Sequence, residues 1–352
     1  MNAAIANTSR PTSKSITEIV LPGLVESSGL VVSKRSLPAP GAGQLTLRME
    51  ATGMSFAEQQ MRRGKYYQQP PFPFVPGYDV VGIVESVGAG VDSAIIGTRV
   101  AAIVKTGGWA TGVSIDASTA IPVGPDIDPA EVESILVSGI TAWQMLHRTA
   151  KARSGQTVVV LGANGAVGSV LVQLARSAGI RVIGTSNARH HDYLRSLGAE
   201  PVDYQAVDFV EQLRSLVPDG VDAVFDHVGG PGIVDSWKLL RRGGTLVAYG
   251  TASNKNDQSN SQLPMYALFA RLVLWNILPN GRGAHFYNLW AGKRRQHTFV
   301  GRLKADLAQV LALLAAGKVV AHVADRIPLV EATRAMDLAE SRTTVGKIVL
   351  VP

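Results

Sequence analysis

Residues 157–168 read Thr-Val-Val-Val-Leu-Gly-Ala-Asn-Gly-Ala-Val-Gly, and this stretch decides how the rest of the chain folds. Its β-branched start, Thr157–Leu161, predicts a buried strand. Glycines then end the strand, and apolar residues return at helical spacing after Gly168. A strand, a glycine turn and a helix aim backbone N–H groups and the positive end of a helix at a pyrophosphate. The stretch therefore predicts a dinucleotide-binding unit.

The glycines of this loop have different expected roles. Gly165 lets the backbone approach the phosphates, whereas Gly168 lets the helix pack closely on the sheet. Ala163 replaces the first glycine of a complete Gly-x-Gly-x-x-Gly motif, so an ordinary tight turn is the alternative interpretation. The α/β units further along the chain favour the binding site. The predicted cofactor contacts in this loop are Asn164, Gly165, Ala166 and Val167.

Length and composition limit the classes of protein to consider. The chain has 352 residues, which suits two domains, and its 46% hydrophobic and 17% charged content is that of a globular protein. It has no cysteine, which excludes disulfides, thiolate catalysis and cysteine-ligated zinc and agrees with a cytoplasmic location. The net charge is +7, but the basic residues are spread along the chain, so we expect no nucleic-acid partner.

Two segments need separate consideration. Residues 1–16 are small and polar, and we expect a flexible tail there. Met265–Leu278 is the most apolar stretch, but Arg271 interrupts it and it is shorter than the ~20 residues of a membrane span. We therefore expect no stable membrane insertion.

The remaining chain divides into a β-rich part and an alternating part. Short strands are predicted at 17–21, 30–33, 44–51, 80–87 and 98–104, followed by helices at 130–138 and 140–150. From residue 158 strands and helices alternate, which predicts a parallel sheet covered on both faces. Residues 253–261 are predicted to form a flexible loop. A helix after residue 305, another at 330–340 and a strand at 347–351 complete the chain.

Several short motifs follow one another along the chain. They are Gly53–Ala57, Met61–Gly64, Pro76–Gly82, Gly97–Val100, Gly139–Ala142, Leu197–Ala199, Asp226–Gly230, Gly243–Gly244 and Gly346–Leu350. In this order they resemble the medium-chain dehydrogenase/reductase superfamily, in its zinc-independent quinone oxidoreductase branch. The resemblance implies an α/β fold with a GroES-like, β-rich catalytic domain (residues 17–136 and 297–352). Residues 137–296 would form the NADPH-binding Rossmann domain, with a doubly wound parallel sheet, and the protein would be a homodimer.

The resemblance also identifies where a catalytic zinc would bind in related alcohol dehydrogenases. Ser55 stands at the first cysteine position, and Tyr78 and Asp79 stand at the His-Glu pair. We therefore expect no metal. Without zinc, the acceptor must spread negative charge itself, as quinones and α,β-unsaturated ketones do after hydride addition.

Two residues are candidates for assisting that chemistry. Ser55 matches a family asparagine beside the nicotinamide, and Tyr66 matches a pocket tyrosine whose phenol could donate to an oxyanion. Gln60 replaces a second family tyrosine, so we do not expect a two-tyrosine pocket. Tyr66 could equally be a half-exposed aromatic residue in a proline-flanked loop.

The end of the second Rossmann strand indicates which cofactor binds. NAD-specific folds usually place an acid there, but residues 183–190 contain none. Donors to a 2′-phosphate are present instead, which favours NADPH: Ser186, Arg189, His190 and, from the resemblance, Tyr204. The resemblance or strand-end positions add the cofactor contacts Thr141, Val228, Gly250, Thr251, Phe286, Tyr287 and Arg342.

The leading hypothesis is therefore an NADPH-dependent, metal-independent reductase of a quinone or an α,β-unsaturated ketone, a small conjugated carbonyl substrate. An enoyl-thioester or alkenal reductase is an alternative, for which Arg62, Arg63 and Lys65 could bind a CoA phosphate. A non-catalytic NADPH-binding or membrane-associated relative is a third. Fold alone does not choose among them.

Overall fold

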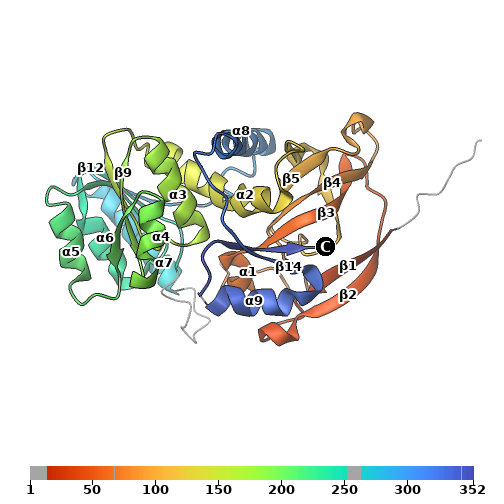
Figure 1. The fold of residues 1–352 in the computed structure, drawn as a ribbon, viewed down its shortest axis with the longest axis horizontal. Helices are drawn as coiled ribbons and strands as arrows, with labels where there is room; N and C mark the ends of the chain where they lie inside the picture. The colour runs from red at the N-terminus through yellow and green to blue at the C-terminus, as the bar shows by residue number, and fades with distance from the viewer. Residues whose placement is uncertain (1–13, 67, 252–262, 342) are drawn as a thin grey trace, which may run out of the picture.

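The computed structural model describes residues 14–66, 68–251, 263–341 and 343–352. Two lobes lie beside each other, one rich in β-strands and one alternating strands with helices (Figure 1). The predicted loop 253–261 and Arg342 lie outside the described residues, as does most of the predicted tail. The first strand begins at Lys14, so it includes the end of the range predicted as tail.

The β-rich lobe is built on a seven-stranded sheet in the order β14-β15-β3-β4-β5-β7, with β6 paired to β3, and on the separate pair β1-β2. Its strands are β1 (Lys14–Val20), β2 (Val31–Leu37), β3 (Gln44–Met54), β4 (Asp79–Val87), β5 (Arg99–Ile103), β6 (Gly112–Asp116), β7 (Ile121–Pro122), β14 (Val323–Pro328) and β15 (Lys347–Val351). β15 pairs antiparallel with β3. The C-terminal strand thus returns to the first lobe, as the predicted fold requires.

The second lobe contains a six-stranded sheet in the order β10-β9-β8-β11-β12-β13, and every neighbouring pair in it is parallel. The strands are β8 (Thr157–Val160), β9 (Arg181–Ser186), β10 (Glu200–Asp203), β11 (Val221–Asp226), β12 (Leu240–Ala248) and β13 (Gly283–Phe286). The helices are α3 (Ala166–Ser177), α4 (His191–Ser196), α5 (Phe209–Leu216), α6 (Ile233–Lys238) and α7 (Leu263–Ile277). The predicted Rossmann sheet is confirmed.

Long helices occupy the region between the lobes (Figure 1). α2 (Pro129–Trp143) continues into a π-helical turn (Gln144–Thr149) and packs against α8 (Gln296–Ala315). The two predicted helices around Gly139 are therefore one continuous helix. A Cβ on Gly139 would lie 2.8 Å from Val310 Cγ1, so this glycine permits close helix packing and does not end the helix.

Two shorter helices belong to the β-rich lobe: α1 (Phe56–Arg62) and α9 (Ala332–Ser341). Throughout the described part of the chain, none of the helices has both the length and the apolar character that crossing a bilayer requires.

Candidate functional site

Two glycines of the loop after β8 are required by the protein's own packing. Gly162 has φ +63°, and a Cβ there would lie 2.2 Å from the ring of His227. That ring is fixed by a 3.0 Å contact between its Nδ1 and the carbonyl oxygen of Leu161. A Cβ on Gly168 would lie 2.4 Å from the carbonyl oxygen of Gly162. These two glycines therefore determine the shape of the turn.

Gly165 is different, because the protein's own packing constrains it much less. It caps α3 with φ −76° and ψ 169°, which any residue can adopt, and a Cβ would meet only the Gly162 carbonyl oxygen, at 3.3 Å. The backbone N–H groups of Ala166 and Val167 follow in the first turn, where a helix has no carbonyl partners to offer. Backbone N–H groups without partners at a helix N-terminus would suit a bound pyrophosphate.

The predicted 2′-phosphate residues come together at the ends of β9 and β10. The backbone N–H of Tyr204 donates to the carbonyl oxygen of Ser186 at 3.2 Å, which joins the two strand ends. Arg189 Nε donates to His190 Nε2 at 3.0 Å. Burial and the nearby Arg189 both lower the pKa of His190. His190 is therefore a neutral acceptor that holds Arg189, and its Nε2 is engaged with Arg189 instead of being directed as a donor at a 2′-phosphate.

The later strand ends converge on the same loop through two residues that the sequence analysis did not single out. The buried carboxylate of Asp226 accepts from the backbone N–H groups of Val228 and Gly229, both at 2.8 Å. A Cβ on Gly250 would lie 2.7 Å from the carbonyl oxygen of His227. Asp226 and His227 thus shape the turn that carries the predicted contacts Val228 and Gly250; Thr251 is partly buried beside it.

Thr141, Phe286 and Tyr287, which were predicted to contact the cofactor, make contacts with other residues of the protein. Tyr287 Oη donates to Gln144 Oε1 at 3.0 Å, and burial raises the pKa of Tyr287 while a hydrogen bond with Thr141 lowers it. Thr141 lies on α2 and is buried. The ring of Phe286 packs edge-on against Phe269, with centroids 5.0 Å apart. Tyr287 and Thr141 thus meet at the junction of β13 with α2.

Ser55 begins α1 and is held by Glu58 in a capping box. The backbone N–H of Ser55 donates to Glu58 Oε2 at 2.9 Å, and the Ser55 hydroxyl also contacts that oxygen. The other carboxylate oxygen accepts from the backbone N–H of Tyr78 at 2.8 Å. Glu58 is 1% exposed, and burial raises its pKa although the hydrogen bond from Ser55 lowers it. Glu58 therefore links Ser55 to Tyr78.

Tyr66, Tyr78 and Trp290, which we call the aromatic trio, form a connected group across the two lobes. Tyr66 Oη and Tyr78 Oη are 3.2 Å apart, and Trp290 Nε1 donates to Tyr78 Oη. The rings of Tyr66 and Tyr78 meet edge-on. Burial is the main cause that raises the pKa of each phenol. A hydrogen-bonded pair of tyrosines is thus present although Gln60 stands at the family's second tyrosine position, because Tyr78 is the partner of Tyr66.

The residues at the zinc positions do not fit a zinc site. Asp79 Oδ2 lies 3.3 Å from Lys347 Nζ, and Glu133 Oε1 lies 2.7 Å from the same ammonium, all three side chains being at most 4% exposed. Ser55 and Tyr78 are neutral hydroxyls engaged with Glu58 and Trp290. Across the described ranges, no group of three or more His, Cys, Asp or Glu side chains is placed to hold a metal ion.

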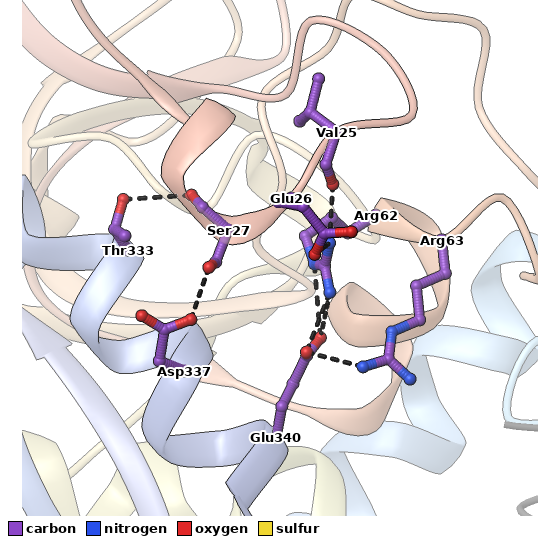
Figure 2. Close-up of polar contacts among 8 residues, drawn as sticks. All are labelled: Val25, Glu26, Ser27, Arg62, Arg63, Thr333, Asp337 and Glu340. Atoms are coloured by element: carbon purple, nitrogen blue, oxygen red, sulfur yellow. Dashed lines mark hydrogen bonds and ion pairs between the residues drawn. The ribbon is translucent and has the colours of Figure 1, made fainter. Parts of the chain in front are cut away.

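The arginines considered for a CoA phosphate are engaged elsewhere. The guanidinium of Arg62, whose side chain is 4% exposed, donates to both carboxylate oxygens of Glu340 at 2.8 Å. Arg63 donates to the same carboxylate at 2.6 Å, and Arg62 also donates to the Val25 carbonyl oxygen at 2.6 Å (Figure 2). This junction joins α1, α9 and the loop before β2, so these two arginines are structural.

Comparisons with known proteins agree with this architecture. A GroES-like domain of alcohol dehydrogenases matches residues 41–124, and a zinc-binding dehydrogenase family matches residues 197–350. The human synaptic vesicle membrane protein VAT-1 homolog is 31% identical over 321 residues, which cover 90% of this chain and 80% of that protein. The chain belongs to the medium-chain dehydrogenase/reductase superfamily, in its quinone oxidoreductase branch.

Solved structures add detail. A mycobacterial protein solved with NADPH is 29% identical, has a TM-score of 0.81 and covers 96% of this chain and 100% of its own. Escherichia coli quinone oxidoreductase, also solved with NADPH, has a TM-score of 0.83 over 96% of this chain and 100% of its own. Its identity is 24%, so it supports the fold alone.

Proposed function

We propose that this protein is an NADPH-dependent reductase that adds hydride to a quinone or an α,β-unsaturated ketone. The observation that carries the proposal is the aromatic trio, which provides a hydrogen-bond donor for a developing oxyanion and is linked through Glu58 to Ser55. The NADPH of the mycobacterial relative and the open N-terminus of α3 support the cofactor.

The direction of hydrogen bonding in the trio follows from donor chemistry. An indole N–H can only donate, so Tyr78 Oη accepts from Trp290 and can pass its own hydrogen to Tyr66. Tyr66 then keeps its hydroxyl hydrogen for a ligand. Hydrogen bonds in such a chain strengthen one another. Because the pKa of Tyr66 is raised, it is a neutral donor at pH 7 rather than a phenolate.

Each group of residues has a distinct role in the proposed reaction. Bound NADPH supplies the hydride. The glycine loop and the start of α3 hold the pyrophosphate, and Arg189 with its neighbours holds the 2′-phosphate. Tyr66 stabilises the enolate or phenolate oxygen that hydride addition creates. Its proton, once given to that oxygen, is replaced from solvent.

The test is an NADPH-oxidation screen across quinones, enones and enoyl-CoA esters, with the variants Y66F and Y78F. We expect turnover of quinones or enones, a fall in kcat of about 10- to 100-fold for Y66F with little change in KM, and a smaller loss for Y78F. Preferred turnover of the CoA esters would support the alternative reductase instead. Turnover unaffected by Y66F would reject Tyr66 as the donor.

We also propose a homodimer formed at β13. This strand ends the six-stranded sheet, and α7 beside it exposes Val273, Leu274 and Ile277, which are 54–73% accessible. Sedimentation analysis should show a dimer, and a monomer at micromolar concentration would contradict it.

The same exposed helix face favours a second candidate function, a membrane-surface role, since the human relative is named as a synaptic vesicle membrane protein. Flotation with anionic vesicles, without NADPH turnover in the screen, would favour that role. The cytoplasmic location remains a prediction.

A further inference from the structure

Two lysines lie over the aromatic trio. Lys105 Nζ is 5.8 Å from the centroid of the Tyr66 ring, and Lys293 Nζ is 4.7 Å from a Trp290 ring centroid. Both distances are within the range of cation–π attraction. Lys105 comes from the loop after β5 and Lys293 from the turn between β13 and α8, so the two cations approach the trio from segments far apart in the sequence.

These two lysines have no acidic partner among the residues that the structure describes. No ion pair there includes either of them, and Lys105 Nζ donates instead to Gln68 Oε1 at 2.9 Å. Burial is the larger cause that lowers the pKa of Lys105, and the positive charge of Lys293 lowers it further. Two like charges without a counter-ion are unfavourable unless a ligand supplies the opposite charge.

The backbone of Lys105 is in an energetically unfavourable conformation. It has φ +73°, which is uncommon for a residue with a side chain. Its N–H donates to the Tyr78 carbonyl oxygen at 3.0 Å, so the loop is tied to the trio. Backbone strain of this kind is concentrated at functional sites.

We propose that the hydride acceptor carries an anionic substituent, a carboxylate or sulfonate, which Lys105 and Lys293 bind while the aromatic trio contacts the conjugated rings. The inference rests on the proposed function, because it names the substrate class of the same site. The partner chemistry follows from the site: a flat, conjugated molecule suits the aromatic faces, and an anion supplies the charge that the two ammonium groups lack.

The experiment compares 1,4-naphthoquinone with 1,4-naphthoquinone-2-sulfonate as acceptors for the wild type, K105Q, K293Q and the double variant. K238Q, at an exposed position of α6, controls for the change in net charge. The ratio of kcat/KM between the two quinones is the readout, because comparing this ratio between proteins cancels their different intrinsic reactivities. Binding of naphthalene-2-sulfonate to the NADP⁺-loaded protein is titrated in parallel.

We expect each lysine variant to lower kcat/KM for the sulfonate about fivefold, and the double variant by more, with the neutral quinone nearly unchanged. Raising the salt concentration should reduce the wild-type preference, and K238Q should behave as wild type. Equal effects on both quinones would overturn the inference and leave the lysines as packing for the rings. If neither quinone is reduced, the proposed function fails, and the sulfonate titration still decides the role of the lysines.

Discussion

Arg189 is the residue on which we expect cofactor choice to depend most directly. NADPH differs from NADH by a 2′-phosphate, so any preference must come from groups that contact that phosphate. His190 accepts from Arg189 and holds its guanidinium at the ends of β9 and β10, beside Ser186 and Tyr204. A residue held in place loses less side-chain entropy when the ligand binds.

We predict that R189A weakens NADPH binding by about 1.5–3 kcal/mol, or one to two decades, and leaves NADH binding almost unchanged. Arg195, which is exposed on α4 and paired with Asp192, provides the control variant R195A. Dissociation constants measured by cofactor fluorescence decide the matter. Equal losses for both cofactors would show that Arg189 does not select between them.

Single residues also show what the sequence could and could not reveal about the site. Ser186, Arg189 and His190 could be placed together from the sequence because they follow one another at the end of one strand, whereas Tyr204, beyond the next strand, was named from the family resemblance; their contact with a cofactor stays a prediction. The sequence identified Tyr78 only as the residue at a zinc-ligand position of related enzymes, and it did not predict the hydrogen bond with Tyr66. Its partner Trp290 lies 212 positions away and on the other lobe, and no local pattern predicts such a contact. The role of Glu58 could not be predicted from the sequence, because it depends on a hydrogen bond from the backbone N–H of Tyr78, 20 residues further along the chain.

At the scale of elements, the loop between β8 and α3 contains glycines of two kinds: those that the protein's own packing requires and one that it constrains only weakly. A Cβ on Gly168 would lie 2.4 Å from the carbonyl oxygen of Gly162, whereas a Cβ on Gly165 would lie 3.3 Å from the same oxygen, so Gly165 is much less constrained by the protein's own packing. The same substitution at the two positions should therefore have different consequences.

We predict that G165A keeps the melting temperature of the cofactor-free protein within a few degrees but weakens NADPH binding at least tenfold. G168A should lower the cofactor-free melting temperature, because helix α3 must move away from the loop. Differential scanning fluorimetry with and without NADPH measures both effects. Normal NADPH binding by G165A would mean that the pyrophosphate does not lie against this turn.

The order and type of most elements followed from periodicity, but their ends and interruptions did not. The strand at 347–351 was predicted, and its place between β14 and β3 follows from the family resemblance rather than from its own residues. The prediction of two separate helices on either side of Gly139 was wrong. A glycine is needed there because Val310 of α8 packs so closely that it leaves no room for a side chain. A packing requirement set by a distant helix leaves no signature in the local sequence.

At the scale of the whole molecule, the junction in Figure 2 connects distant parts of the chain. Burial alone would raise the pKa of Glu340, but hydrogen bonds from Arg62 and Arg63 outweigh it and hold that pKa below its usual range. A carboxyl group with a lowered pKa stabilises the fold above its unfolded-state pKa of about 4.3. This contribution is lost as the pH falls through the lower, folded-state pKa.

We predict that E340Q lowers the free energy of unfolding at pH 7 by about 1.5–3 kcal/mol. The difference from wild type should shrink as the pH falls below the unfolded-state pKa of about 4.3, and it should disappear only below the lower folded-state pKa, where Glu340 is protonated in both folded and unfolded protein. E331Q, which removes an exposed pair with Arg334, is the matched control and should cost little. Urea unfolding at pH 7 and pH 3.5 tests this, and a pH-independent difference would contradict it.

The position of β15 between β14 and β3 has a consequence for how the protein is made. A ribosome releases β3 early, and β6, which pairs with its residues 44–48, soon afterwards, but the partner of residues 52–54 is released only after the whole Rossmann lobe. The Rossmann lobe is continuous in sequence and can fold as it emerges. Most of the β-rich lobe is synthesised first, but residues 52–54 of β3 stay without this strand partner until translation reaches residues 347–351. During that interval this short stretch of backbone offers hydrogen-bonding groups with which another chain could pair.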